Sequence, residues 1–530
     1  MRWTWNSFLL ALAFSVCFAT FPANASETQT TPIDPTEDVE RGLKAIRVGR
    51  YEHAVERLER AVTSAPDSVP AQLGLAWAYL KMRQFGPCVR QAVKVLEKAP
   101  ENARAHAIVG VALMRIGFLP EAAGSFDAAL RSDSGEVLAI AGRAELDLYV
   151  GNLAESLRRS RDAVARSPRE PDFLYLLGQT ASRQERYEEA ADAYERFLGV
   201  AADIDSDRRS RIRGLISLYR RLNGRNLYQV KGPKSVDVPM VLSDSRLPTV
   251  DVMLNGKGPF RFVIDSGAGF VVVSDDVART LKLRRVAAGG TSRGVSGTGR
   301  FSIVYGVLDK LALGGMSMDS VPTYIRKIHE TSQRAKVDGY IGLSVLSHFR
   351  IAVDYERRVL ELRPADEPGQ PIAEGDVEIP YRMTNGGMMS VRADIGTEVA
   401  LNFIVDTGAS STVVSSRAFE RYNLAAKQHK GVAVRVVGAG GVTDNVPVVV
   451  LDRLQLQGGG RLHEFVRAIV LDLDPVNETA GFEQSGIVGS DMLRFFRVEF
   501  DFARSTIVFR PNGRNLQAPG PAPPVPGDRT

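Results

Sequence analysis

The sequence predicts a multidomain protein in which an all-α repeat solenoid is followed by an all-β domain with two similar lobes. Small residues recur every 34 residues between about residues 35 and 202. From about residue 230 the chain changes to short β-type runs separated by Gly, Pro and Asn. Within this second part, Phe262–Ala268 recurs almost unchanged as Phe403–Ala409. A repeated apolar run ending in Asp-(Ser/Thr)-Gly-Ala indicates a duplicated half-domain.

The N-terminus predicts an exported protein. Arg2 precedes an apolar run from Phe8 to Phe18, and Ala23-Asn24-Ala25 fits the small-residue cleavage rule, so residues 1–25 are expected to be a signal peptide. The alternative is a membrane anchor, but the run is short for spanning a bilayer, which needs about 20 residues. We therefore expect a periplasmic or secreted protein with no integral membrane segment after cleavage.

Composition is that of a soluble globular chain, with 44% hydrophobic and 24% charged residues over 530 positions. The net charge of +5 is small for this length and does not favour nucleic acid as a partner. Signal cleavage would remove Cys17 and leave Cys88 alone, so no intrachain disulfide is expected.

The first domain, residues 35–225, is expected to hold five repeats and a capping helix near 204–225. Small residues occupy two positions of each repeat: Gly42, Ala76, Gly110, Ala144 and Gly178 at one, and Ala54, Cys88, Ala122, Ser156 and Ala190 at the other. This pattern resembles the tetratricopeptide repeat. The resemblance implies closely crossing helices and a concave surface that binds a protein partner. The basic face of the last helix is interpreted as solvated, with an acidic partner or membrane surface as the alternative.

The second domain is expected to have lobes at residues 236–364 and 376–511, joined by a short linker. The duplication continues downstream of the motif, since Gly339–Gly342 matches Gly486–Gly489 and Phe349–Tyr355 matches Phe496–Phe502. Residues 512–530 are rich in proline and are predicted to be disordered.

The duplicated region resembles the retropepsin-like and pepsin-like aspartic proteases. The residues that carry the resemblance are Asp265-Ser266-Gly267-Ala268, Asp406-Thr407-Gly408-Ala409 and the downstream triplets Tyr340-Ile341-Gly342 and Ile487-Val488-Gly489. The resemblance implies that Asp265 and Asp406 are catalytic. It also implies that Ser266, Gly267, Thr407 and Gly408 support the two loops. Two carboxylates close together cannot both ionise, so such a pair holds one proton and activates a water.

Two glycine-rich segments lie where that family carries a flexible flap. They contain Gly294, Gly297 and Gly299 in the first lobe and Gly438, Gly440 and Gly441 in the second. Glycine-rich tips suit a moving hairpin. Ordinary hairpin turns are the alternative, and a bilobal enzyme needs only one flap.

The sequence therefore favours an exported aspartic endopeptidase whose repeats recruit a protein or peptide substrate, or a partner. The alternative is a non-catalytic peptide-binding scaffold that keeps the protease fold. The pair of aspartates could form within one chain or across a dimer, and the short linker and the divergence of the halves favour one chain. The six histidines are scattered without a zinc motif, so neither metal nor cofactor is expected.

Overall fold

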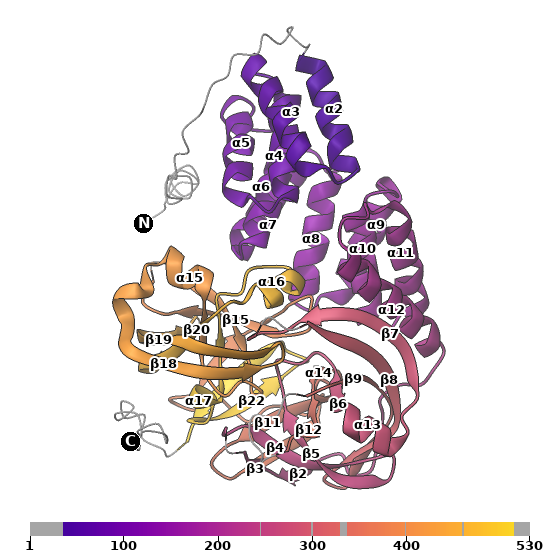
Figure 1. Cartoon of the computed structure of the whole chain (residues 1–530), viewed down its shortest axis with the longest axis vertical. Coiled ribbons are helices and arrows are strands. Elements are labelled where there is room, and N and C mark those ends of the chain that lie inside the picture. The colour runs from indigo at the N-terminus through magenta and orange to yellow at the C-terminus, as the bar shows by residue number, and fades with distance from the viewer. Residues whose placement is uncertain are drawn as a thin grey trace. The chain divides into compact units, whose positions relative to one another are not determined.

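The computed structural model describes residues 35–243, 245–297, 300–328, 336–397, 399–457 and 461–512. These residues form two compact units (Figure 1). The first holds most of the chain up to Ser206, and the second holds Asp207 onward with the short segments Tyr149–Gly151 and Arg186–Ala191. The predicted signal peptide lies outside the described residues, as does the predicted tail except Asn512.

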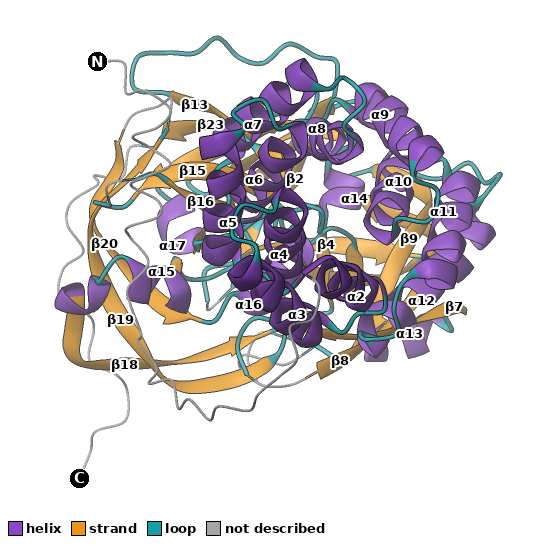
Figure 2. Ribbon diagram, turned by 90° about the horizontal axis from the view of Figure 1, so that it is seen from above, coloured by secondary structure: helices purple, strands orange, loops and turns teal. Residues whose placement is uncertain are grey.

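Helices alone make up the first part of the chain (Figure 2). They follow one another in pairs that match the five predicted repeats: α2 (Pro35–Arg47) with α3 (Tyr51–Ser64), α4 (Val69–Lys81) with α5 (Phe85–Lys98), α6 (Ala103–Arg115) with α7 (Leu119–Ser132), α8 (Val137–Tyr149) with α9 (Leu153–Arg166), and α10 (Pro171–Arg183) with α11 (Tyr187–Val200).

The two helices of a repeat meet where the sequence has small residues. A Cβ added to Gly110 would lie 2.6 Å from the ring of Phe126, and one added to Gly178 would lie 2.5 Å from the ring of Tyr194. In the repeat between these two, Ala144 takes the place of the glycine and Ser160 takes the place of the aromatic residue. Ala144 and Ser160 are both fully buried. Glycine therefore stands where the opposing side chain is large, because protein interiors leave no spare volume.

Cys88 occupies one of these small-residue positions on α5. Its side chain is fully buried, and burial raises the pKa of its thiol to about 12. A thiol that does not ionise near neutral pH is a poor nucleophile. Cys88 therefore acts as a small apolar residue in the repeat core.

The predicted capping helix, α12 (Ser206–Leu222), lies from Asp207 onward in the second compact unit. A Cβ added to Gly214 would lie 2.5 Å from Gly289 Cα in strand β7 (Arg285–Arg293), so helix and strand touch through their backbones. The Arg211 guanidinium donates a hydrogen bond to the Thr291 carbonyl oxygen over 3.1 Å. At least this arginine of the predicted basic face is therefore engaged by the β-domain.

The first lobe is built on a nine-stranded sheet. Its main path runs β1 (Gln229–Lys231), β9 (Met316–Arg326), β6 (Val271–Ser274), β10 (Gly339–Ile341), β5 (Lys257–Ile264), β4 (Pro248–Leu254), β8 (Arg300–Leu313) and β7, with β3 (Val241–Leu242) beside β4. An additional pairing between β8 and β9 folds the sheet back on itself. Strand β10 runs parallel to β5, with Tyr340 opposite Val263. Two short helices, α13 (Asp275–Leu281) and α14 (Leu343–Leu346), complete the lobe.

The second lobe repeats this plan with an eight-stranded sheet. The order is β14 (Arg382–Met383), β15 (Met389–Asp394), β16 (Leu401–Val405), β21 (Gly486–Val488), β17 (Val413–Ser415), β20 (Arg461–Leu471), β19 (Gly441–Leu456) and β18 (Gln428–Gly438). Strands β18 and β19 form the long hairpin visible in Figures 1 and 2. Strand β21 runs parallel to β16, as β10 does to β5. The helices of this lobe are α15 (Ser416–Arg421), the 3₁₀ helix η1 (Leu424–Lys427), α16 (Asp474–Ala480) and α17 (Ser490–Leu493).

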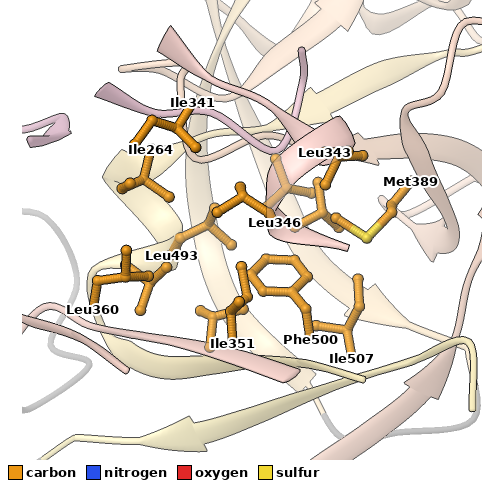
Figure 3. Close-up of a cluster of buried hydrophobic side chains, with 14 of the residues drawn as sticks. Ile264, Ile341, Leu343, Leu346, Ile351, Leu360, Met389, Leu493, Phe500 and Ile507 are labelled. Atoms are coloured by element: carbon orange, nitrogen blue, oxygen red, sulfur yellow. The ribbon is translucent and has the colours of Figure 1, made fainter. Parts of the chain in front are cut away.

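A six-stranded sheet joins the lobes. Its order is β13 (Val377–Pro380), β23 (Thr506–Pro511), β22 (Phe496–Asp501), β11 (Phe349–Asp354), β12 (Val359–Pro364) and β2 (Val236–Pro239). The central pair comes from the two matched segments, with Ile351 opposite Phe500. Figure 3 shows these two side chains in one apolar core with Ile264 and Ile341, the residues that end β5 and β10.

The predicted fold class is confirmed: a helical-repeat part precedes an all-β bilobal domain. Among the helices of the described ranges, none combines the length and apolar character that crossing a membrane requires.

Candidate active site

Asp265 and Asp406 occupy equivalent turns in the two lobes. Each follows directly on buried strand residues, the last three of β5 or the whole of β16. The Asp265 N–H donates to the Ile341 carbonyl oxygen and the Asp406 N–H donates to that of Val488, both over 3.0 Å. The parallel strands β10 and β21 therefore hold the two aspartates in matching positions.

The residues after the two aspartates hydrogen-bond across the lobe boundary. The Thr407 hydroxyl accepts from the Ser266 N–H at 3.0 Å and donates to the Ile264 carbonyl oxygen at 2.7 Å. The Ser266 hydroxyl accepts from the Thr407 N–H at 3.0 Å and donates to the Val405 carbonyl oxygen at 2.9 Å. Both side chains are almost completely buried. Because each hydroxyl both accepts and donates a hydrogen bond across the boundary, the two loops are fixed relative to each other.

Gly267 and Gly408 let the two carboxylates face each other. A Cβ added to Gly267 would lie 2.5 Å from Asp406 Cγ, and one added to Gly408 would lie 2.5 Å from Asp265 Cγ. The Gly267 N–H donates to Asp265 Oδ1 over 2.8 Å, and the Gly408 N–H donates to Asp406 Oδ1 over 2.7 Å. Each glycine therefore serves its own aspartate with an N–H group and leaves room for the aspartate of the other lobe.

Burial and the Asp406 carboxylate together raise the pKa of Asp265 well above its ordinary value, although the Gly267 N–H opposes the shift. Burial also raises the pKa of Asp406, which the Gly408 N–H opposes. Two close carboxylates titrate as a unit, so the pair keeps one shared proton above the ordinary carboxyl range. A pair in which one carboxyl group is protonated and the other is ionised supplies both a general acid and a general base.

Three residues that support these loops were not predicted from the sequence. The Ser490 hydroxyl donates to the Thr407 carbonyl oxygen over 2.9 Å, and Tyr355 OH lies 3.2 Å from the Ser490 Oγ. In the duplication Ser490 corresponds to Leu343 and Tyr355 corresponds to Phe502. The sequence signal that could have identified Ser490 and Tyr355 is a hydroxyl group that one half of the duplication has and the other half lacks.

Asp491 is the third such residue and lies beside the Asp406 loop. Its carboxylate accepts from both the N–H and the hydroxyl of Thr412, at 3.0 and 2.8 Å. Burial raises the pKa of Asp491 to about 6, against these hydrogen bonds. In the first lobe the matching Ser344 accepts from the Val271 N–H over 3.3 Å. In each lobe, therefore, the short helix α14 or α17 is hydrogen-bonded to the beginning of the strand that comes after the aspartate, to Val271 of β6 or to Thr412 just before β17.

The two predicted flaps end in hairpin tips that touch each other. The Gly440 N–H donates to the Val295 carbonyl oxygen over 3.2 Å, and the Gly297 N–H donates to Thr443 Oγ1 over 2.6 Å. The Ser296 hydroxyl, almost buried, lies 3.1 Å from Thr443 Oγ1.

The glycines at the tips allow this close approach. A Cβ added to Gly294 would lie 2.5 Å from the carbonyl carbon of Ala439, and one added to Gly438 would lie 2.9 Å from Ser296 Cβ. Both lobes therefore contribute a hairpin. Of the predicted flap residues, Gly299 lies outside the described ranges.

Models of known protein families match stretches in both halves of the chain. The aspartyl protease family matches residues 250–345 and 391–492, which include Asp265 and Asp406. Two tetratricopeptide-repeat families match residues 45–112 and 142–207. No curated protein matches the chain.

Solved structures similar to the chain include two repeat proteins. A tetratricopeptide-repeat protein of Thermus thermophilus is 21% identical over 34% of this chain and 99% of its own, with a TM-score of 0.30. One from Parabacteroides merdae is 18% identical over 36% of this chain and 73% of its own, with a TM-score of 0.28.

Proposed function

We propose that this chain, which joins tetratricopeptide repeats to a domain of the aspartyl protease family, is an exported endopeptidase that uses Asp265 and Asp406 as its catalytic pair. The observation that carries the proposal is the set of four hydrogen bonds between Ser266 and Thr407 and the opposite loop. These bonds hold two carboxylates face to face in a single chain.

In the proposed mechanism the pair carries one proton. The ionised carboxylate takes a proton from a water held between the two aspartates, and that water attacks the scissile carbonyl carbon. The protonated carboxyl group donates a hydrogen bond to the carbonyl oxygen, where negative charge develops. Because the pair titrates as a unit, neither aspartate is restricted to one role.

A non-catalytic peptide-binding scaffold is the alternative. The two functions differ in the outcome of one experiment, incubation of the purified chain with an unstructured protein over a range of acidic to neutral pH. The enzyme is expected to produce fragments that disappear when either aspartate is replaced. A scaffold would bind the protein and leave it intact.

We further propose that the repeats recruit the substrate or a partner that brings it. Tetratricopeptide repeats support protein interactions, and stacked repeats offer an extended surface for them. Removing residues 35–205 is expected to lower kcat/KM for a protein substrate more than for a short peptide, because only the protein reaches the repeats. Equal losses for both substrates would show instead that the repeats support the fold of the enzyme.

Export is the last part of the proposal and rests on the N-terminal sequence. Removal of the predicted signal peptide should give a mature chain that starts near Ser26. N-terminal sequencing of the protein from cell fractions tests this. A chain in the cytoplasm that still begins at Met1 would contradict it.

A further inference from the structure

Arg326 ends strand β9 and stacks on two aromatic rings of the first lobe. The centre of its guanidinium lies 4.9 Å from the ring centroid of Phe301 and 5.7 Å from that of Tyr340. Stacking on rings fixes the plane of a guanidinium and leaves its N–H donors at the edges available. Arg326 is only half-buried, so these edges are within reach of a ligand.

The two rings connect Arg326 to the flap and to the catalytic loop. Phe301 is on β8, next to Arg300, where the first hairpin returns from its tip. Tyr340 precedes Ile341, whose carbonyl oxygen accepts from the Asp265 N–H. The charge of Arg326 favours the ionised form of Asp265, which opposes the rise in the pKa of that carboxyl. Its two rings therefore link Arg326 to the strand that returns from the flap and to the strand that holds the Asp265 loop.

Arg326 also differs from two arginines near the tip of the neighbouring β7–β8 hairpin. Arg293 pairs with Glu478 at 3.2 Å and Arg300 pairs with Asp207 at 2.6 Å. Within the described ranges, the guanidinium of Arg326 has neither an ion pair with a carboxylate nor a hydrogen bond. A cation that is held by two rings, and that has no carboxylate partner among the described residues, is suited to receive one from a ligand.

We propose that Arg326, supported by Phe301 and Tyr340, forms a subsite for the carboxylate of an acidic residue close to the scissile bond of the substrate. The inference rests on the proposed function and adds a substrate class to it. The guanidinium presents paired donors to the two oxygens of a carboxylate, and the rings pack on the aliphatic part of the glutamate side chain. An amide such as glutamine offers one acceptor oxygen and no charge, so the same subsite discriminates against it.

The test uses peptides that are acetylated and amidated at their ends and differ only by Glu or Gln at one position. The position is moved along the residues on either side of the scissile bond. At one position, wild-type enzyme is expected to favour Glu by roughly 10- to 100-fold in kcat/KM, the range of a hydrogen-bonded charge pair. Equal rates for Glu and Gln at every position would overturn the proposal.

Variants locate the preference. Arg326→Gln should bring the Glu/Gln ratio close to one, and Arg326→Lys should keep part of the preference because it retains the charge without the planar fork. Arg326→Glu should favour a peptide with Lys at the same position. Arg300→Gln is the matched control and should leave the ratio unchanged, since that arginine is already paired. A ratio that survives in Arg326→Gln would contradict the assignment.

Two further arms separate the possible failures. Peptides with a free C-terminus distinguish a terminal carboxylate from a side chain, and a preference confined to the free terminus would overturn the side-chain assignment. If no peptide is hydrolysed, the proposed function fails, and the affinities of the Glu and Gln peptides are then compared by fluorescence anisotropy. Equal affinities would overturn this inference, while tighter binding of the Glu peptide that Arg326→Gln abolishes would support it without catalysis.

Discussion

Replacing either Asp265 or Asp406 with asparagine is expected to abolish peptide hydrolysis. Each carboxylate lies against the glycine two residues after the other aspartate, and burial raises the pKa of both carboxyl groups, which favours one proton held by the pair. Asparagine keeps the shape of the side chain but can neither take a proton from water nor hold the shared one. Loss of acid–base function alone costs about 10²- to 10⁴-fold in rate. In the proposed mechanism, both the activation of the water and the hydrogen bond to the carbonyl oxygen depend on this pair. The measurement is kcat/KM for a capped peptide, with each variant purified alongside wild type.

The control for this prediction is Asp276→Asn. Asp276 is an exposed aspartate on α13 that pairs with Arg279 and Lys336. This variant should cleave at the wild-type rate. Near-normal activity in either Asp265→Asn or Asp406→Asn would show that the two aspartates do not form one shared site.

The same pair predicts how stability depends on pH. Burial and mutual repulsion raise the pKa of Asp265 in the folded protein above its value in the unfolded chain. The folded state therefore binds the proton more tightly, and the resulting stability is present in acid and lost as the pH rises through the folded-state pKa. In thermal unfolding scans between about pH 4 and pH 8, Asp265→Asn should lack this loss. An identical pH dependence in wild type and variant would contradict the shared proton.

The repeat half was predictable because its signal is local and periodic. Each small residue meets a neighbour one helix away, so the 34-residue spacing survives in the sequence. The choice between glycine and alanine at one position was not predictable in the same way. Gly110 and Gly178 face Phe126 and Tyr194, and the pairing becomes visible only once the crossing of the two helices is known.

The positions of the two aspartates were predictable because each motif is a strand followed by a turn. Of the contacts that join the lobes, those of Ser266 and Thr407 were implied by the family resemblance. The others were not predictable, because they depend on which strands pair across the duplication. The bond between Tyr355 and Ser490 spans residues from different halves, and so do the contacts between the flap tips. Nothing in the sequence singled out Arg326, because the two rings that it contacts, Phe301 and Tyr340, come from separate strands.

Thr407→Val is expected to destabilise the β-domain by about 2–6 kcal/mol and to lower activity together with stability. Valine has the shape of threonine but lacks the hydroxyl, so the buried Ser266 N–H loses its acceptor and the Ile264 carbonyl oxygen loses its donor. Leaving a buried polar group unpaired costs about 1–3 kcal/mol each. Thr407→Ser is the matched control, because it keeps both bonds and loses only a methyl group, worth about 1 kcal/mol.

Chemical unfolding of the two variants, followed at the β-domain, separates the hydrogen bonds from the packing of the methyl group. Thr407→Val should unfold at clearly lower denaturant concentration than Thr407→Ser. Its kcat should also fall further, because the bonds that set the position of the Asp265 loop relative to the Asp406 loop are gone, and misplacement of about 1 Å costs on the order of 100-fold in rate. Equal midpoints for the two variants would mean that the hydroxyl of Thr407 does not hold the lobes together. Equal midpoints with a lower kcat in Thr407→Val alone would assign the hydroxyl to the alignment of the two aspartates and not to the stability of the fold.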